Sequence, residues 1–512
     1  MKRIWLLYAL TFVSNVFAQN NTISINQFYK DQLYSSFKGK KYKGGDFLPC
    51  TESEFNLPKH IRDSSKQYYL LTSILFKKHL IVLKGDDYFI TFSPVIELSL
   101  GKNKTDSIKP RKFQNTRGFV VEGDFFKNFS FSSSFYENQA RFTEYQTNYF
   151  ISNGELYPTY KSYSPQNAVI SGGARTKPFK ENGFDYAYAF GNIVYKVNNR
   201  LTILAGNNSH FIGAGYRSLF LSDNSFNSPY LQSNYKLSSK WDFTYLRSKL
   251  TNLMRRQYTS SAEAYYIPKA LSVNYLTYKP TEKLTLSLFE GIIWGKGDSI
   301  VSRSVSPFFY NPIPLIGTFI KNDKYGIIGL NGKYRFSDQL LAYSQVSTAH
   351  FSDFGFQLGV RKYASLLGLN NAMVQFEYNT IPSNLYESSD NRLLSYSNGN
   401  LPLAHVLGSG FHEFISRVNY EYDRFYVDFK FIFAALRNYQ VTRLNGFSLE
   451  STEQNGGLQN HEIEVGYRFN RKVNLCVFGS YIYRNDQSSS TPITQFFSIG
   501  LKTALTNRYT DF

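Results

Sequence analysis

The stretch that decides the fold is FGFQLGVRKYASLLGLNNAMVQFEYNT, residues 354–380. Its first half has apolar residues at the even positions from 354 to 360, with Gly, Gln, Gly and Arg at the odd positions. Its second half alternates Ala, Val, Phe and Tyr with Met, Gln, Glu and Asn over residues 372–379. A period of two predicts strands with one apolar face and one polar face. A soluble sandwich also alternates, but glycines, amides and charges opposite unbroken aromatics are typical of a transmembrane barrel whose polar face lines the lumen.

The same alternation recurs from Tyr88 onward and predicts an all-β fold: a single transmembrane antiparallel β-barrel of about 18 strands (16–18). Around residues 425–433, for example, an almost all-Phe face lies opposite Asp428 and Lys430. An even strand number is expected when both ends of the barrel sequence lie on the periplasmic side. The candidate strands are 88–98, 117–126, 128–137, 184–195, 200–208, 229–237, 241–248, 270–278, 283–292, 325–336, 339–348, 354–363, 371–380, 414–422, 425–434, 460–469, 473–483 and 495–505.

The composition agrees with a barrel in the cell outer membrane. There are 46 Phe and 41 Tyr against 3 Met and 2 Cys, and the mean hydropathy is only −0.34. A barrel exposes every second strand residue to lipid, and aromatic residues form girdles at both membrane interfaces. The net charge of +19 would attract an acidic surface polysaccharide or the phosphates of lipopolysaccharide, although a basic loop surface without such a partner explains it equally well. Nucleic acid is excluded as a partner of an exported chain.

Residues 1–18 are predicted to be a secretory signal peptide. Lys2 and Arg3 precede an apolar run over 4–13, and Val16 and Ala18 occupy the small-residue positions before a cleavage site at Gln19. Residues 19–85 then form a small N-terminal periplasmic or plug-like segment, with a basic patch at 38–45 and a helix over about 64–78. Residues 86–512 form the outer-membrane barrel.

Connection lengths alternate as a barrel requires. Tight turns at 337–338 and 422–423 are assigned to the periplasmic side, and the long connections 138–183, 208–228, 293–324, 381–413 and 435–459 to the exterior. The alternation fades after Leu505, which predicts a short tail beyond the last strand. Cys50 and Cys476 could pair in an oxidising envelope, and the sequence leaves this open.

The sequence contains no catalytic signature, and its seven histidines lack metal-ligand spacing. We therefore expect a protein that is not an enzyme, with no catalytic residue, metal or cofactor. The lumen-facing charges have both signs, which favours ion pairs that brace the wall over a selectivity ring.

The densest stretch is residues 182–231, where small residues oppose Tyr186, Tyr188 and Phe190 before a Gly-rich excursion. The pattern predicts a loop folded against an inner wall, because glycines permit close approach of backbones. Sugar binding is the sharper alternative, since tyrosine faces with Asp, Asn and Arg edges suit a carbohydrate. The candidate carbohydrate-binding residues are Asn207, Asn208, His210, Tyr216, Arg217, Asp223, Arg361 and Arg417.

Several runs together resemble a known family. They are NTRGFVVEGDFF (115–126), ENQARF (137–142), FDYAYAFGNIVY (184–195), GNNSHFIGAGYRSLFLSDNS (206–225), IKNDKYGIIGLNGKYRF (320–336) and VQFEYN (374–379). As a set they resemble the Wzi-type capsule-assembly outer-membrane proteins, and within these the RemB-type gliding-motility branch.

The resemblance implies an 18-stranded barrel with a helical N-terminal part. It also implies a lectin-like role in attaching capsule or exopolysaccharide to the cell surface, in capsule assembly or surface gliding motility. A further implied partner is a periplasmic component of a gliding or secretion machine. The wet lumen face leaves an alternative, a porin or substrate channel of the outer membrane, and outer-membrane lipid is a partner in either case.

Overall fold

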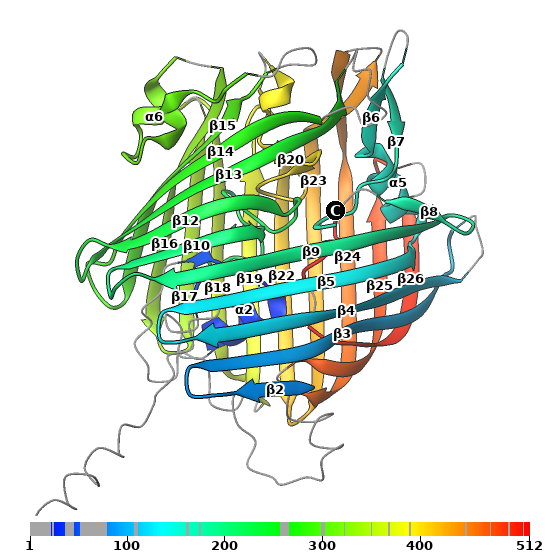
Figure 1. The fold of residues 1–512 in the computed structure, drawn as a ribbon. Helices are drawn as coiled ribbons and strands as arrows, with labels where there is room; N and C mark the ends of the chain where they lie inside the picture. Colours follow the sequence, from blue (N-terminus) through cyan, green and yellow to red (C-terminus); the bar gives the residue numbers. More distant parts are fainter. Residues whose placement is uncertain are drawn as a thin grey trace, which may run out of the picture.

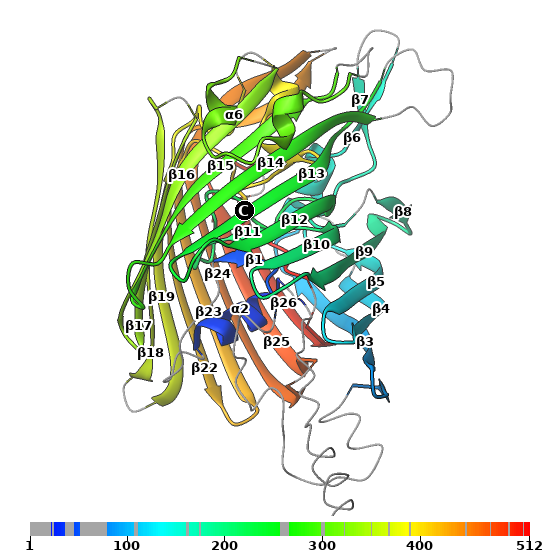
Figure 2. The ribbon, with the colours of Figure 1, turned by 60° about the vertical axis from the view of Figure 1, so that its left-hand side comes forward.

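The fold is a closed antiparallel barrel of 18 strands with a few short helices, as predicted (Figures 1 and 2). The computed structural model describes residues 22, 25–35, 46–51, 79–106, 111–159, 163–173, 176–256, 266–297, 303–321, 323–349, 351–366, 369–388, 391–445, 448–471, 473–489, 492–504 and 506–512. Each predicted strand corresponds to one wall strand, and β26 pairs with β3 to close the barrel. The wall strands are β3 (Tyr88–Asn103), β4 (Lys112–Phe125), β5 (Phe129–Arg141), β9 (Gly183–Lys196), β10 (Leu201–Asn208), β12 (Ser228–Lys236), β13 (Trp241–Arg255), β14 (Tyr266–Tyr278), β15 (Leu284–Gly295), β16 (Lys324–Ser337), β17 (Leu340–Thr348), β18 (Phe354–Leu366), β19 (Leu369–Ile381), β22 (Phe411–Tyr422), β23 (Phe425–Asn445), β24 (Ser448–Asn470), β25 (Leu475–Asp486) and β26 (Ile493–Lys502).

The hairpin β18–β19 shows how the alternation builds the wall. Phe356 and Leu358 are 44% and 60% exposed on the outside, whereas Gln357 and Arg361 between and after them are fully buried inside. The two strands pair in register from Phe356 opposite Thr380 onward, so Gln357 and Asn379 share the inner face. The period of two thus decides which side chains meet lipid and which meet the lumen.

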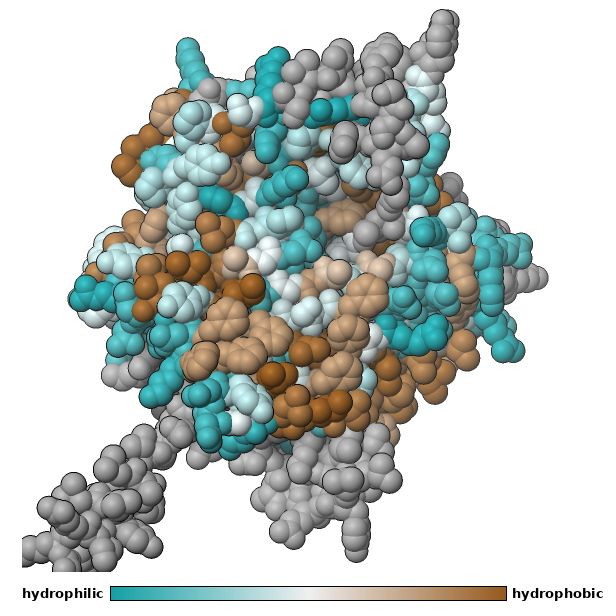
Figure 3. Space-filling model, viewed as in Figure 1, coloured by the Kyte–Doolittle hydropathy of each residue, from teal (hydrophilic) through white to brown (hydrophobic). Residues whose placement is uncertain are grey.

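Large apolar side chains are exposed all around the wall, among them Leu98, Phe119, Ile193, Leu330 and Phe497. In the face shown in Figure 3 they form a hydrophobic region over β3, β4, β5 and β10. An outward apolar band of this kind is the lipid-facing surface of an outer-membrane barrel. Among the described residues, no helix is long and apolar enough to cross a bilayer.

The interior of the barrel is filled by segments from four parts of the chain. These are the helix α2 (Gln27–Ser35) with residues 46–51, the connection 209–227, the connection 382–410, and residues 506–512 after β26. The short strands β1 (Phe47–Leu48) and β11 (Phe211–Ile212) pair with each other inside the barrel. Residues 382–410 contain η3 (Arg392–Leu394), β20 (Ser397–Asn398) and β21 (Leu401–Pro402). Figures 1 and 2 place the C-terminus in the middle of the barrel, in agreement with a tail beyond the last strand.

Three predicted exterior connections differ from the prediction. Connections 208–228 and 381–413 fold back into the lumen, because apolar residues such as Phe220 and Leu401 are buried there. For 208–228 this agrees with the loop folded against an inner wall that the glycines predicted. Residues 435–459 are not a loop: β23 and β24 extend as a hairpin beyond their neighbours, pairing as far as Asn445 and Ser448. Residues 435–459 were predicted as a loop because many of them are polar, but polar residues can also pair as a two-stranded ribbon.

The other connections carry the remaining elements. Residues 142–182 contain α5 (Glu144–Ser152), β6 (Glu155–Pro158), β7 (Tyr163–Gln166) and β8 (Lys177–Phe179), and β2 (Ile81–Lys84) pairs with β3. The β15–β16 connection contains η2 (Pro307–Tyr310) and α6 (Ile316–Phe319). Cys50 and Cys476 are both buried, and no disulfide joins them. The predicted signal peptide, the basic patch at 38–45 and the helix at 64–78 lie outside the described residues.

Candidate functional site

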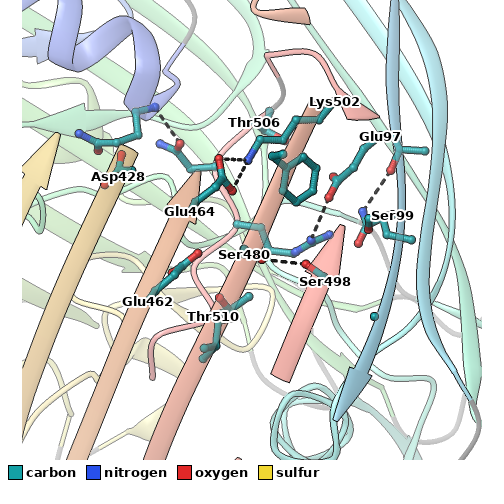
Figure 4. Close-up of a pocket in the computed structure, with 18 of the residues that line it drawn as sticks. Glu97, Ser99, Asp428, Glu462, Glu464, Ser480, Ser498, Lys502, Thr506 and Thr510 are labelled. Carbon is teal, nitrogen blue, oxygen red and sulfur yellow. Dashed lines mark hydrogen bonds and ion pairs between the residues drawn. The ribbon is translucent and has the colours of Figure 1, made fainter. Parts of the chain in front are cut away.

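A polar cavity of about 360 Å³ lies inside the barrel (Figure 4). One side is the inner wall of β3, β4 and β5 together with β22 to β26. The other side is formed by α2 with Asn26 before it, and by Thr503 and residues 506–510. The cavity exists because the alternation turns polar side chains inward while the internal segments leave this part of the lumen unfilled.

Most charges around this cavity are neutralised in pairs. Lys502 donates to both carboxylate oxygens of Glu464 at 2.7 and 2.6 Å, as Figure 4 shows. Glu462 pairs with Lys430 at 2.8 Å, and Arg468 pairs with Glu421. These are the ion pairs predicted to brace the wall. Because each carboxylate lies beside a basic group, the paired charges largely cancel within the cavity.

Arg508 forms the longest of the ion pairs around this cavity. Its guanidinium lies 3.9 Å from a carboxylate oxygen of Glu97 and donates a hydrogen bond of 3.3 Å to the hydroxyl of Tyr186. Its Nε is buried without a hydrogen-bond partner among the described residues. Burial opposes a charge there, but Tyr186 and Glu97 hold the pKa of Arg508 above its ordinary value. The cavity therefore contains a permanent cation with unused donor capacity.

Hydroxyl, amide and aromatic groups complete the lining. Thr116 donates to the amide oxygen of Asn138 at 2.7 Å, and Ser480 and Ser498 share a hydrogen bond of 2.7 Å. Aromatic side chains of the lining, such as Tyr188, add flat apolar faces. A ring-shaped polyhydroxyl ligand needs this mixture of short polar groups and aromatic faces.

A second cavity of about 240 Å³ adjoins the first, since Asp428, Glu462, Glu464, Lys502 and Arg508 line both. It brings in two of the predicted site residues, Tyr216 and Arg417. The guanidinium of Arg417 lies 4.9 Å from the ring centre of Tyr216, and Lys430 donates to the Tyr216 hydroxyl at 3.2 Å.

Arg217 lies next to Tyr216 in a buried cluster of ion pairs. It donates to Asp511 at 3.0 Å and to Glu413 at 3.1 Å, and its side chain is 2% exposed. Burial opposes the charge of Asp511, but Arg217 and Lys430 hold the pKa of that carboxyl well below its usual range. Arg217 therefore fixes residues 506–512 to the wall instead of facing open space.

The remaining buried candidates anchor internal segments. Arg417 contacts both carboxylate oxygens of Asp31, at 2.9 and 3.4 Å, and Arg361 donates to Asp31 at 3.3 Å, so α2 is held by the wall. Asp223 accepts hydrogen bonds of 2.7 Å from Tyr509 and from Asn507. Burial raises the pKa of Asp223, although these bonds oppose the rise.

The last three candidates lie apart from both cavities. Asn207 donates to the carbonyl of Ala189 at 3.0 Å, and Asn208 donates to Asn192 at 3.3 Å. His210 packs its ring at 4.5 Å from the ring of Tyr230, and burial lowers its pKa to about 3. The structure thus gathers five of the eight candidates, Tyr216, Arg217, Asp223, Arg361 and Arg417, around the internal segments.

The sequence did not single out Arg508, Glu97 or the residues of α2. Glu97 was recognisable as a polar position within a predicted strand, but its place in the barrel follows only from the pairing of β26 with β3. Arg508 belongs to the tail, and no periodicity predicts where a tail folds. Among the described residues, no cluster of His, Cys, Asp and Glu is arranged to hold a metal ion.

No protein-family model matches the sequence, and no curated protein matches it significantly. Among solved structures, the chain is similar to Wzi, an outer-membrane protein of Escherichia coli involved in group 1 capsule assembly and described as a carbohydrate-binding β-barrel. The TM-score is 0.56 at 12% identity, covering 95% of this chain and 100% of Wzi. A weaker likeness links it to OprD of Pseudomonas aeruginosa, with a TM-score of 0.42, 10% identity, and coverage of 81% of this chain and 96% of OprD. The likeness to Wzi concerns the fold, an outer-membrane β-barrel.

Proposed function

We propose that this protein binds a capsular or secreted polysaccharide inside its barrel, as an outer-membrane lectin, and that it does not catalyse a reaction. The observation that carries the proposal is the polar cavity, whose wall charges are paired and whose lining includes the guanidinium of Arg508. A pocket with hydroxyls, amides and aromatic faces holds a sugar by hydrogen bonds at its edges and by contact with its apolar faces.

The charges favour an acidic polysaccharide. The wall carboxylates Glu421, Glu462 and Glu464 are neutralised by basic partners, so they would not repel an anionic sugar strongly. The Arg508 side chain is 21% exposed, so its terminal nitrogens can donate to a carboxylate or phosphate of the ligand. The net charge of +19 would draw acidic polysaccharide or lipopolysaccharide to the protein.

The biological setting is part of the same proposal. Wzi is a carbohydrate-binding barrel of capsule assembly, which gives a precedent for this activity on a barrel of this kind. We propose capsule assembly or surface gliding motility as the process, export by the signal peptide at 1–18, and contact of residues 19–85 with a periplasmic gliding or secretion component. Tyr216 and Arg417 are retained as ligand contacts in the second cavity.

The test is a binding titration of purified acidic capsule against the detergent-solubilised protein. Arg508→Gln removes the cation and leaves a shorter polar side chain, and we expect binding at least tenfold weaker. Arg200→Gln removes an exposed cation from the tight turn before β10 and is the matched control, with unchanged binding expected.

Equal binding by Arg508→Gln and the wild type would remove this cavity as the site. Binding of acidic capsule by neither protein would remove the lectin proposal itself. In cells, unchanged capsule attachment and unchanged spreading of a deletion strain would contradict the proposed process.

A further inference from the structure

The connection between β15 and β16 folds over the outside of the barrel. Residues 303–321, here called the outer flap, contain η2 and α6, and both ribbon views place α6 against the outer side of β14, β15 and β16 (Figures 1 and 2). Beneath the outer flap lie three wall residues that a lipid-facing surface does not normally carry: Arg247, Asn274 and Glu290.

The direction of these three side chains follows from their neighbours. Phe289 faces inward, because its ring stacks at 4.5 Å on Phe220 of an internal segment. Glu290 therefore faces outward. Arg247 and Asn274 lie on the same outer face, because Asn274 is paired with Glu290 and neighbours Arg247 across β13–β14.

The outer flap satisfies this polar cluster. Thr318 donates to Glu290 from its backbone at 3.0 Å and from its hydroxyl at 2.8 Å. Arg247 donates to the carbonyl of Asn311 at 2.6 Å, and Asn274 donates to Glu290 at 2.9 Å. As a result Glu290 is only 1% exposed and Arg247 6% exposed, although both point away from the lumen.

The cluster lies at the depth of the membrane band. Glu290 is six residues along β15 from its first residue, Leu284, which is roughly 20 Å at ~3.3 Å per residue. A strand tilt of about 40° reduces this to roughly 15 Å of height, within an apolar band about 25 Å tall. An uncovered carboxylate and guanidinium at that height would face hydrocarbon.

The outward face of the flap is apolar. Phe309 packs inward on Ile292 and Trp294 of the wall. Its exposed large apolar residues are Phe308, Tyr310, Ile313, Ile316 and Phe319, each 41% to 69% exposed, and the exposed charges Arg303 and Lys321 lie at its two ends. They continue the exposed wall residues Leu286 and Leu330, and Figure 3 shows hydrophobic atoms at the flap.

We propose that the outer flap lies in the outer leaflet of the membrane, where lipid acyl chains cover Phe308, Tyr310, Ile313, Ile316 and Phe319. The flap covers the polar cluster of Arg247, Asn274 and Glu290, and presents an apolar surface to the lipid instead. Lipid is the occupant because the flap surface is continuous with the lipid-facing band and lies at its height. In water, five clustered apolar side chains would be an unfavourable exposed patch.

The test uses spin labels on the full chain in lipid vesicles, in a Cys50→Ala, Cys476→Ala background. Labels at Ile313→Cys and Phe319→Cys report accessibility to oxygen, which concentrates in lipid, and to a water-soluble nickel chelate. Leu330→Cys is the lipid-facing reference, and Ser352→Cys in the β17–β18 connection is the aqueous reference.

We expect both flap labels to match Leu330→Cys, with high oxygen and low chelate accessibility. Accessibility matching Ser352→Cys would overturn the proposal. Low accessibility to both reagents, or dipolar coupling between labels of two molecules, would show a protein partner on this face and would also overturn it.

A charge placed on the flap gives an independent measurement. Phe319→Asp should lower the fraction of protein that folds into vesicles at least fivefold relative to Ser352→Asp, because only the first places a carboxylate in hydrocarbon. Equal folded fractions for the two variants would contradict a lipid location.

Discussion

Arg217 joins three parts of the chain that are distant in sequence. Its side chain contacts Glu413 of β22 and Asp511 of the tail, and its backbone N–H donates to Glu377 of β19 at 3.0 Å. Removing one partner of a buried ion pair is costly, because the remaining charges stay buried without compensation.

We therefore expect Arg217→Met to lower the free energy of unfolding by about 3–5 kcal/mol, measured by urea titration in lipid vesicles. Met keeps the apolar stem, so the change isolates the charge. Arg200→Met, on an exposed turn, should change stability by less than about 0.5 kcal/mol. Similar unfolding midpoints for the two variants would show that the cluster does not stabilise the fold.

His210 gives the interior a response to acid. Burial lowers its pKa to about 3, against an ordinary value of 6.5, so the folded state favours the neutral ring. Between these values the unfolded state binds the extra proton, and stability falls as the pH falls. From pH 7 to pH 5 we expect a loss of about 2 kcal/mol from this group.

In urea titrations at pH 7 and pH 5, His210→Gln should no longer show this loss of unfolding free energy. The control His79→Gln changes a partly buried histidine and should show the same loss as the wild type. Parallel losses in wild type and His210→Gln would assign the acid sensitivity to other groups.

At the scale of elements, the wall was predictable, whereas of the interior only the inward fold of the Gly-rich connection and the existence of a tail were. Alternation fixes a strand because every second residue meets lipid, so hairpins such as β18–β19 were located within a few residues. The segments that fill the lumen are held by apolar packing and by polar contacts between distant residues, such as Asp31 with Arg417 or Tyr509 with Asp223, which leave no period in the sequence. The same holds for the cavity. The strand pattern predicts the residues of its wall side, but not those contributed by α2 and by the tail, which includes Arg508.

The outer flap illustrates the same limit on the lipid side. Arg247 and Glu290 break the apolar alternation, and a pattern alone cannot tell whether such residues line the lumen or lie under a cover. The structure shows the cover, and a break in alternation at the membrane height is the signal that could have indicated it.

For the whole molecule, the segments that fill the interior oppose free passage through the barrel. An empty 18-stranded barrel would leave a water-filled pore. Here the lumen is crossed by α2, held through Asp31 to Arg361 and Arg417, and by the tail, held through Asp511 to Arg217 and Lys430. These contacts hold α2 to the wall, and the tail to the wall and to the connection 209–227.

We expect no steady conductance from the wild-type protein in planar bilayers. Deletion of residues 25–51 together with 506–512 removes two of the four internal segments and should produce steady openings, because the wall strands pair without them. Deletion of residues 440–451 is the matched control, since the tip of the β23–β24 hairpin extends beyond its wall neighbours and its loss should leave the barrel closed. Steady large conductance from the wild type would instead favour the porin alternative, because it would mean that the internal segments leave a continuous aqueous path. A sugar in the lumen would then be a transported substrate and not a bound ligand.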